Sequence, residues 1–336
     1  MNKEPLILAI ESSCDDTSAA IMRGRKSLSN VVTTQDVHKE FGGVVPELAS
    51  RAHQKNIIPV VDTAIKRAGI KKEELDAIAF TRGPGLLGSL LVGVSFAKSF
   101  SMALNKPMIE VNHMEAHILA HMIDDGFKTP EFPFLCLTVS GGHTQLVVVK
   151  SPMEMEVIGE TIDDAAGEAF DKISKIMGLP YPGGPLIDKY AKEGNPGAYI
   201  FPHPKVGELE FSFSGLKTSV LRFLQKEVRR NENFVDENLK DICASVQKTI
   251  VDILLNKIQS ASKKTGINRV AIAGGVSANS ELRNRLLKNR LGWDVFIPDF
   301  QFCTDNAGMI AIAGYFKFQA GQFVDQSVTA NARLKI

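Results

Sequence analysis

The sequence has few of the residues that mark secreted or membrane proteins. It contains only 4 cysteines, far apart and without a CxxC pair, which predicts reduced thiols rather than a disulfide framework: Cys14, Cys136, Cys243 and Cys303. Residues 1–5 have no basic region leading into a signal peptide. The longest apolar stretch, 86–97, stops at Lys98 and is too short to cross a bilayer. We therefore expect a cytoplasmic protein without a membrane partner.

The chain also lacks an excess of charge of either sign. Its 336 residues include 39 Lys and Arg against 38 Asp and Glu, a net charge of +1, so a nucleic-acid partner would need a local patch or a helper subunit. The length suggests about two domains. Two amphipathic helices are expected at 216–230 and 239–264, and the first is the most basic region, which a merely solvated helix face also explains: Lys217, Arg222, Lys226, Arg229 and Arg230.

A pair of histidines stands at the spacing of one helical turn. Residues 107–111 predict a short strand, and the helix that follows begins near His113. Because residues four apart lie on one helical face, His113 and His117 can aim their imidazoles at one metal ion. His121 continues the row. The alternative is a set of polar residues on a helix surface.

Two short hairpins of one design occur in the two halves of the chain. The first has strands at 6–10 and 18–22, and the second has strands at 134–139 and 145–149. Each turn is small and polar, and such turns can present backbone N–H groups and hydroxyls to a phosphate, although each hairpin alone also fits a plain surface turn. Their recurrence predicts a duplicated α/β domain with a ligand in the cleft between the copies.

Three further features suggest a ligand site. A strand at 269–273 runs into Gly274 and Gly275 and then a helix, which is a nucleotide-binding geometry, although the third glycine of a Rossmann fingerprint is missing. Asp164, Glu168 and Asp171 have the spacing of one helical face, where a solvated surface is the alternative reading. Near the C-terminus, Thr304 or Asp305 is a natural N-cap, and a carboxylate at a helix start can also bind a metal.

Taken together, these segments resemble the TsaD family of tRNA threonylcarbamoyladenosine transferases, once called O-sialoglycoprotein endopeptidases. The match runs in order along nearly the whole chain and is nearer to the bacterial branch. Its motifs are His-Met-Glu-Ala-His at 113–117, Ser-Gly-Gly-His-Thr at 140–144, and the segments 163–172, 181–184, 211–217, 274–279 and 303–306.

The resemblance implies the duplicated fold of actin, Hsp70 and sugar kinases (the ASKHA fold), with two lobes and the active site in the interlobe cleft. An N-terminal lobe over 1–130 would carry the histidine pair. A C-terminal lobe over 131–336 would have a helical insertion at about 195–265 and a last helix that closes back on the N-terminal lobe.

The resemblance also implies a reaction. A threonylcarbamoyl group would pass from threonylcarbamoyl-AMP to the adenosine 3′ of the anticodon, in tRNAs reading codons that begin with A, releasing AMP. One divalent metal per subunit, Fe2+ or alternatively Zn2+, would sit on His113, His117 and Asp305. In bacteria the family works with the proteins TsaB and TsaE. The substrate-binding residues would be Thr138, Val139, Ser140, Gly141, Gly142, Asp171, Gly184, Asp188 and Asn279.

No residue is an obvious general base, with Glu11 and Asp15 as candidates. Two rival functions stay open. A metalloprotease of the His-Glu-x-x-His type is disfavoured because Glu115 lies in the second place after His113, about 200° around the helix and away from the metal face. The second rival is a non-catalytic ATP-binding scaffold of the same fold. Metal occupancy and acyl transfer to tRNA separate it from the enzyme.

Overall fold

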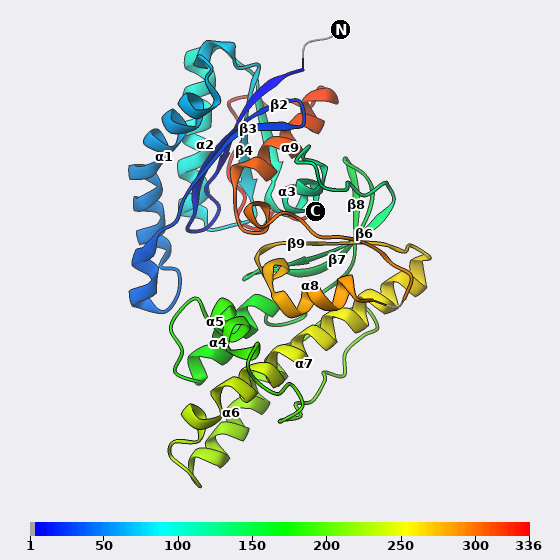
Figure 1. The fold of residues 1–336 in the computed structure, drawn as a ribbon. Helices are drawn as coiled ribbons and strands as arrows, with labels where there is room; N and C mark the ends of the chain where they lie inside the picture. The colour runs from blue at the N-terminus through cyan, green and yellow to red at the C-terminus, as the bar shows by residue number, and fades with distance from the viewer. Residues whose placement is uncertain (1–3, 290) are drawn as a thin grey trace. The chain divides into compact units, whose positions relative to one another are not determined.

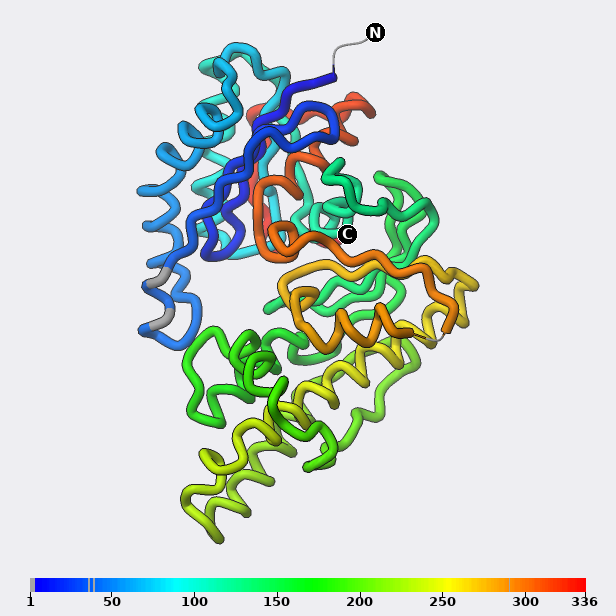
Figure 2. Tube along the Cα trace, in the orientation of Figure 1, coloured from blue at the N-terminus to red at the C-terminus, as the bar shows by residue number. Residues whose placement is uncertain are grey.

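A computed structural model describes residues 4–289 and 291–336 (Figures 1 and 2). The chain divides into two units. Unit 1 comprises Met1–Pro130, Lys150–Met155 and Pro298–Ile336, and unit 2 comprises Glu131–Val149 and Glu156–Ile297. The family resemblance implies a C-terminal lobe over 131–336 whose last helix returns to the N-terminal lobe. In the structure, Pro298–Ile336, which contains that helix, is part of unit 1.

Unit 1 is built on a five-stranded sheet in the order β3-β2-β1-β4-β5. The first three strands form an antiparallel meander, and β4 and β5 run parallel to β1. Parallel strands need crossover connections, which helices α1 and α2 supply. The strands are β1 (Leu6–Glu11), β2 (Thr17–Arg23), β3 (Lys26–Thr33), β4 (Ala77–Gly83) and β5 (Met108–Asn112).

Helices cover both faces of this sheet. On one face lie α1 (Pro46–Ala68) and α2 (Leu87–Leu104), and on the other lies α9 (Ala307–Gln319) (Figure 1). The approach of α9 is close, because a Cβ added at Gly314 would lie 2.7 Å from the Cβ of Ala79 on β4. The short helix α3 (His113–Leu119) packs against α9. Four 3-10 turns complete the unit: η1 (Asp36–Phe41), η2 (Lys72–Glu74), η3 (Ala120–Met122) and η5 (Phe300–Phe302).

The apolar run that stops at Lys98 in the sequence is part of helix α2, which continues to Leu104. Within the residues that the structure describes, α2 is the one helix that by length and composition alone could cross a membrane, with 18 residues of which 33% are buried. It contacts α1 and β4, and Leu90, Val94 and Ala97 are fully or almost fully buried. A core helix that lies along a sheet passes the same test of length and composition.

Unit 2 repeats the topology of unit 1. Its sheet has the order β10-β9-β6-β7-β8, with β6 and β7 antiparallel and β9 parallel to both β6 and β10. The two predicted hairpins are therefore equivalent elements of two copies of one fold, which confirms the predicted duplication. The strands are β6 (Phe134–Val139), β7 (Thr144–Ser151), β8 (Glu154–Glu160), β9 (Arg269–Ala273) and β10 (Asp294–Phe296).

The helices of unit 2 enclose a second core. The long helix α7 (Phe234–Thr265) contributes a buried apolar series, including Ile250 and Leu254, that packs with β6 and the helices α5, α6 and α8. The predicted amphipathic pair is present as α6 and α7. The remaining elements are α4 (Ala166–Ile176), α5 (Gly183–Ala191), α6 (Ser214–Val228), η4 (Gly275–Ala278) and α8 (Ser280–Leu287).

The last residues of the chain form a strap along one edge of unit 1. The backbone N–H of Asn331 donates to the carbonyl of Arg82 (2.8 Å), and that of Gly85 donates to Ala332 (3.3 Å). Further along, the side-chain amide of Asn112 donates to the carbonyl of Lys335 (3.0 Å). The strap therefore joins the end of β4 to the start of α3.

The contact of Gly314 with β4 predicts a large effect of a small substitution. Gly314→Val places a branched side chain against a fully buried strand, and overpacking of this kind costs about 1–3 kcal/mol. We expect a lower free energy of unfolding in urea denaturation. Gln319→Val, at an exposed position of the same helix, should change it by less than about 0.5 kcal/mol. Equal midpoints for the two variants would contradict the close packing.

Candidate metal centre and nucleotide site

The histidine helix α3 starts where strand β5 ends. Asn112 is its N-cap, and the side-chain oxygen accepts hydrogen bonds from the backbone N–H groups of Met114 (2.8 Å) and Glu115 (3.4 Å). An N-cap of this type fixes the first turn of a helix. Because the cap sits directly before His113, the first histidine is held at the edge of the sheet.

His113, His117 and Asp305 meet in unit 1. One potential ligand atom from each lies within 4.8 Å of the others. Asp305 Oδ1 is 3.1 Å from His117 Nε2 and 3.4 Å from His113 Nε2. The two rings lie edge to face with centroids 4.7 Å apart. The sequence prediction that the two histidines share a helical face is confirmed, and Asp305 reaches them from 188 residues further along the chain.

The separation of these atoms fits the coordination shell of one cation. Nitrogen and oxygen ligands at the usual 2.0–2.2 Å from zinc lie about 2.9–3.4 Å from each other. The two Nε2–Oδ1 separations fall in this range. Two imidazoles and one carboxylate also form the donor set of zinc and non-haem iron centres that keep positions open for substrate.

A buried carboxylate supports the first histidine. His113 Nδ1 lies 3.0 Å from Glu11 Oε2 and 3.2 Å from Ser13 Oγ. Glu11 Oε2 also accepts a hydrogen bond from Thr81 Oγ1 (2.6 Å), and its other oxygen accepts from the backbone N–H of Ser13. A hydrogen bond from Nδ1 to a carboxylate leaves the lone pair of Nε2 free for a metal. His117 differs, because its buried Nδ1 has no hydrogen-bond partner among the described residues.

The pKa values of this cluster follow from its burial and its charges. For His113, burial lowers the pKa, but the carboxylates of Asp305 and Glu11 outweigh burial and raise it well above its ordinary value. For Glu11 and Asp305, burial raises the pKa, and the imidazole of His113 outweighs it and lowers both. The cluster is therefore stabilised by attraction between opposite charges, and a cation at its centre would replace the proton.

One detail of the sequence prediction needs correction here, whereas the expected position of Glu115 away from the histidines agrees with the structure. The N-cap of α9 is Asn306, whose side chain accepts from Met309 N (3.1 Å), rather than Thr304 or Asp305. The carboxylate of Asp305 is therefore free to face the histidines. Glu115 does not belong to the cluster. Burial raises the pKa of Glu115, and the charge of Lys317 on α9 opposes the rise. Because Glu115 is not in the cluster, the geometry of a His-Glu-x-x-His protease is absent from α3.

In unit 2, the predicted phosphate turn joins β6 to β7. The backbone N–H of Ser140 donates to His143 O (2.8 Å), and Ser140 O accepts from Gly167 N at the start of α4 (3.1 Å). The close approach requires glycine, because a Cβ at Gly167 would lie 2.5 Å from Ser140 O. Gly141 and Gly142 face open space, since a Cβ on either would have no atom within 4 Å.

The glycine pair after β9 lies beside this turn. Gly274 adopts φ +87°, and a Cβ there would lie 2.5 Å from Val139 O at the end of β6. Thr138 and Val139 themselves are buried, and Thr138 Oγ1 donates to Gln145 O (3.3 Å). A ligand can therefore reach the turn at 140–142 but not these two side chains.

The predicted carboxylate stripe is not one helical face. Asp164 precedes α4, which starts at Ala166. Lys172 neutralises the first two members, with Nζ 2.8 Å from both Asp164 and Glu168. Asp171 turns the other way: its Oδ1 accepts from the backbone N–H groups of Gly183 (2.8 Å) and Gly184 (3.2 Å) at the start of α5. Burial raises the pKa of Asp171, and these two bonds oppose the rise.

The last two predicted substrate residues, Asp188 and Asn279, lie around the start of α8. Asp188 Oδ1 accepts from both the backbone N–H (3.1 Å) and the hydroxyl (2.7 Å) of Ser280. Asn279 caps α8 through Leu282 N (3.0 Å) and donates to the buried Gln247 (2.8 Å). The predicted nucleotide residues of unit 2 thus gather at the N-termini of α4, α5 and α8.

Several residues of these sites were missed from the sequence. Gln247 lies inside a long amphipathic helix, and Ser280 carries no motif. Gly167 falls within the family segment 163–172, but only its neighbours in space show its role. Asp16 is the last residue of the β1–β2 turn, has one buried oxygen without a partner among the described residues, and has a pKa that burial raises to about 7. Its position in a run of polar residues was the only available signal.

Comparison with known proteins identifies the family. The family model of TsaD, tRNA N6-adenosine threonylcarbamoyltransferase, matches residues 26–312. Proteins of that name from Christiangramia forsetii and Riemerella anatipestifer are 63% and 60% identical to the chain. The first alignment covers 98% of both chains and the second 99%.

Solved structures agree on the fold. Component A of (R)-2-hydroxyglutaryl-CoA dehydratase from Acidaminococcus fermentans superposes with a TM-score of 0.55 at 14% identity, covering 93% of this chain and 98% of the other. Full-length HypF gives 0.61 at 15% identity over 95% of this chain and 47% of HypF. These support the ASKHA fold that the family resemblance implied. The chain belongs to the TsaD family of tRNA N6-adenosine threonylcarbamoyltransferases.

Proposed function

We propose that the protein transfers a threonylcarbamoyl group from threonylcarbamoyl-AMP to the N6 amine of the adenosine 3′ of the anticodon, in tRNAs reading codons that begin with A. The observation that carries this proposal is the near full-length identity to relatives named tRNA N6-adenosine threonylcarbamoyltransferase. Transfer breaks the bond between the carbamoyl carbon and the phosphate oxygen, forms a bond to N6, and releases AMP. The amine proton is lost.

The metal would be held by His113, His117 and Asp305, with Fe2+ or Zn2+ as the candidates. When bound, it supplies a Lewis acid that polarises the carbamoyl carbonyl. The protein residues provide the preorganisation: Glu11 orients the His113 ring, and the Asn112 cap fixes the helix that carries both histidines. The ligand atoms are within reach of one ion, and no large rearrangement is required.

The adenylate would occupy the predicted residues of unit 2. Backbone N–H groups of the open turn at Gly141 and Gly142 are available to the phosphate, whose negative charge grows as AMP leaves. Asp171 and Asp188 hold the starts of α5 and α8 in place rather than presenting free carboxylates. They act as positioning residues, together with Asn279 and its partner Gln247.

The structure makes Glu11 a poor candidate for the general base. Glu11 is fully buried and committed to His113, Thr81 and Ser13, so it is not a mobile proton acceptor. Asp15 remains a candidate, and Asp16 joins it because its buried Oδ1 has no partner among the described residues and burial raises its pKa to about 7. An aryl amine attacking an activated carbonyl needs little assistance, so either carboxylate would have a modest role.

The metal assignment predicts which histidines bind the ion. His113→Ala and His117→Ala should each abolish stoichiometric metal in the purified protein, as measured by elemental analysis, while thermal unfolding stays cooperative. His121→Gln is the matched control, since His121 is buried one turn further along and lies outside the cluster. Full metal occupancy in both alanine variants would exclude this site.

A substitution in the open turn at Gly141 should weaken nucleotide binding without lowering the stability of the fold. In Gly141→Val the new side chain meets no protein atom, so the melting temperature should change little. ATP or adenylate affinity, measured by calorimetry, should fall about tenfold, which is 1.4 kcal/mol. Gly215→Val, at another open glycine of unit 2, should leave that affinity unchanged. Unaltered binding in Gly141→Val would mean that the turn is only structural.

The reaction itself can be reconstituted. Threonylcarbamoyl-AMP, unmodified tRNA, this protein and the proposed partners TsaB and TsaE should yield modified tRNA and AMP, detected by mass spectrometry of nucleosides. Omitting this protein, or using His113→Ala, should leave the tRNA unmodified. If modification proceeds equally well without this protein, a scaffold function replaces the catalytic one.

A further inference from the structure

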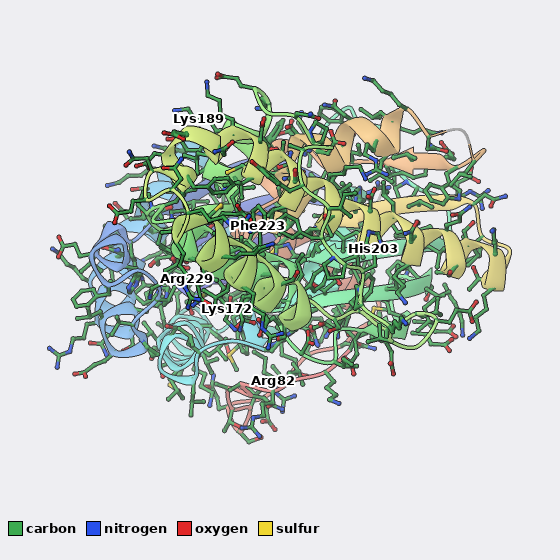
Figure 3. All side chains as sticks on the ribbon, turned by 90° about the horizontal axis from the view of Figure 1, so that it is seen from below. Arg82, Lys172, Lys189, His203, Phe223 and Arg229 are labelled. Atoms are coloured by element: carbon green, nitrogen blue, oxygen red, sulfur yellow. The ribbon has the colours of Figure 1, made fainter. Side chains whose placement is uncertain are left out.

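Helix α6 carries a basic face that the proposed reaction does not use. At its C-terminal end, Arg222, Lys226, Arg229 and Arg230 are exposed, and Glu227 is the one acidic residue of the helix. The whole chain has a net charge of only +1, so this concentration is local. In Figure 1, α6 lies at the end of unit 2 away from its sheet, and Figure 3 views that side with Arg229 and Phe223 labelled on the helix.

The helical period places these cations together. Arg222 and Lys226 lie one turn apart on α6, and Arg229 and Arg230 follow directly after its last residue, Val228, with the backbone N–H of Arg230 donating to Glu227 O (2.9 Å). Leu216, Val220 and Leu224 form the opposite, buried side of α6 and belong to the core of unit 2. The basic side chains therefore stand on, or directly after, a helix that packs against the core of unit 2.

The charges on this face are poorly neutralised. Glu227 is 3.5 Å from Arg230 and 4.0 Å from Lys226. Arg222 and Arg229 have no ion-pair partner among the residues that the structure describes. Elsewhere in unit 2, cations near the nucleotide residues are paired, as Lys172 is with Asp164 and Glu168. The face consequently has an excess of positive charge available to a partner.

The side chains form a shallow basin. A surface depression of about 330 Å³ is lined by Arg222, Gln225, Lys226, Arg229 and Arg230. Guanidinium groups bind phosphate oxygens through paired N–H donors, and an amide adds a neutral donor. A basin edged by three arginines and a lysine is suited to phosphate groups.

The start of α6 is tied to the proposed substrate site. Asp163 accepts hydrogen bonds from Ser212 Oγ (2.5 Å) and from the backbone N–H groups of Phe213 (2.8 Å) and Ser214 (3.4 Å). Asp163 lies just before α4, which carries Asp171 and contacts α6. From Gly215 to Arg229 the helix extends about 21 Å at 1.5 Å per residue. The basic face is thus held at a fixed distance from the adenylate residues of the same unit.

We propose that this face binds the phosphate backbone of the tRNA substrate. The inference rests on the proposed function, because a tRNA is far larger than the adenosine it presents and its phosphates must be supported elsewhere. Such contacts position an RNA and carry no sequence information. Favourable placement of cations at a helix C-terminus is an incomplete explanation, because that effect is confined to the last turn and Arg222 lies two turns before the end of the basic run.

The test removes charge without reversing it. In the full-length protein, Arg222→Gln with Arg229→Gln should weaken binding of an unmodified tRNA transcript about tenfold or more at about 0.1 M salt, measured by fluorescence anisotropy. Each lost phosphate contact should reduce the slope of log affinity against log salt by about 0.7–0.9. Lys263→Gln with Lys264→Gln removes the same charge from exposed positions at the end of α7 and should behave as wild type.

The outcomes separate this inference from the proposed function. ATP affinity and melting temperature should match wild type in both double variants. Unchanged tRNA affinity and salt slope in the arginine variant overturn the inference, while tRNA modification by wild type leaves the function standing. An equal loss of tRNA affinity in the lysine control would mean that only net charge matters, and it would also overturn the inference. If the wild-type protein binds tRNA through this face but never modifies it, the proposed transferase function is wrong and the inferred binding surface is retained.

Discussion

One buried carboxylate, that of Glu11, organises the candidate metal centre of unit 1. Strands β1, β4 and β5 are parallel and adjacent, so their carboxyl ends deliver Glu11, Thr81 and His113 to the same edge of the sheet. An isolated carboxylate in a protein interior is strongly unfavourable. Here it accepts hydrogen bonds from Ser13 and Thr81 and faces His113. The interaction can form only when all three strands are in register, so it couples strand pairing to the orientation of the histidine.

The two units show how one topology supports two kinds of chemistry. Ligands of open α/β sheets bind beyond the carboxyl ends of the strands, and both candidate sites obey this rule. In unit 1 that edge carries charged and imidazole side chains. In unit 2 the equivalent edge is kept clear by glycines, since a side chain at Gly167 would strike Ser140 of the β6–β7 turn and one at Gly274 would strike Val139 at the end of β6. The first edge is suited to a cation and the second to a phosphate.

Local features of the sequence predicted much of this arrangement, and long-range ones did not. The spacing of His113 and His117 on α3 is a property of the helix itself, and the two hairpins are visible as alternating apolar runs and short turns. The resemblance supplied Asp305. The role of Glu11 depends on a contact between residues 102 positions apart, which no local pattern contains. The cap of α9 was misplaced because Thr304, Asp305 and Asn306 are all good caps by composition, and packing decides among them.

The strap at the end of the chain links two features that the sequence keeps far apart. Asn112 caps the histidine helix with its oxygen and donates its amide group to the carbonyl of Lys335. The Asn112 side chain therefore contacts both the first turn of α3 and the strap. Opening of the strap would free the Asn112 side chain to rotate, and the amide protons of Met114 and Glu115 would then exchange with solvent more readily. Hydrogen exchange at the metal helix thus becomes a reporter for the conformation of the last residues, which contribute no ligand.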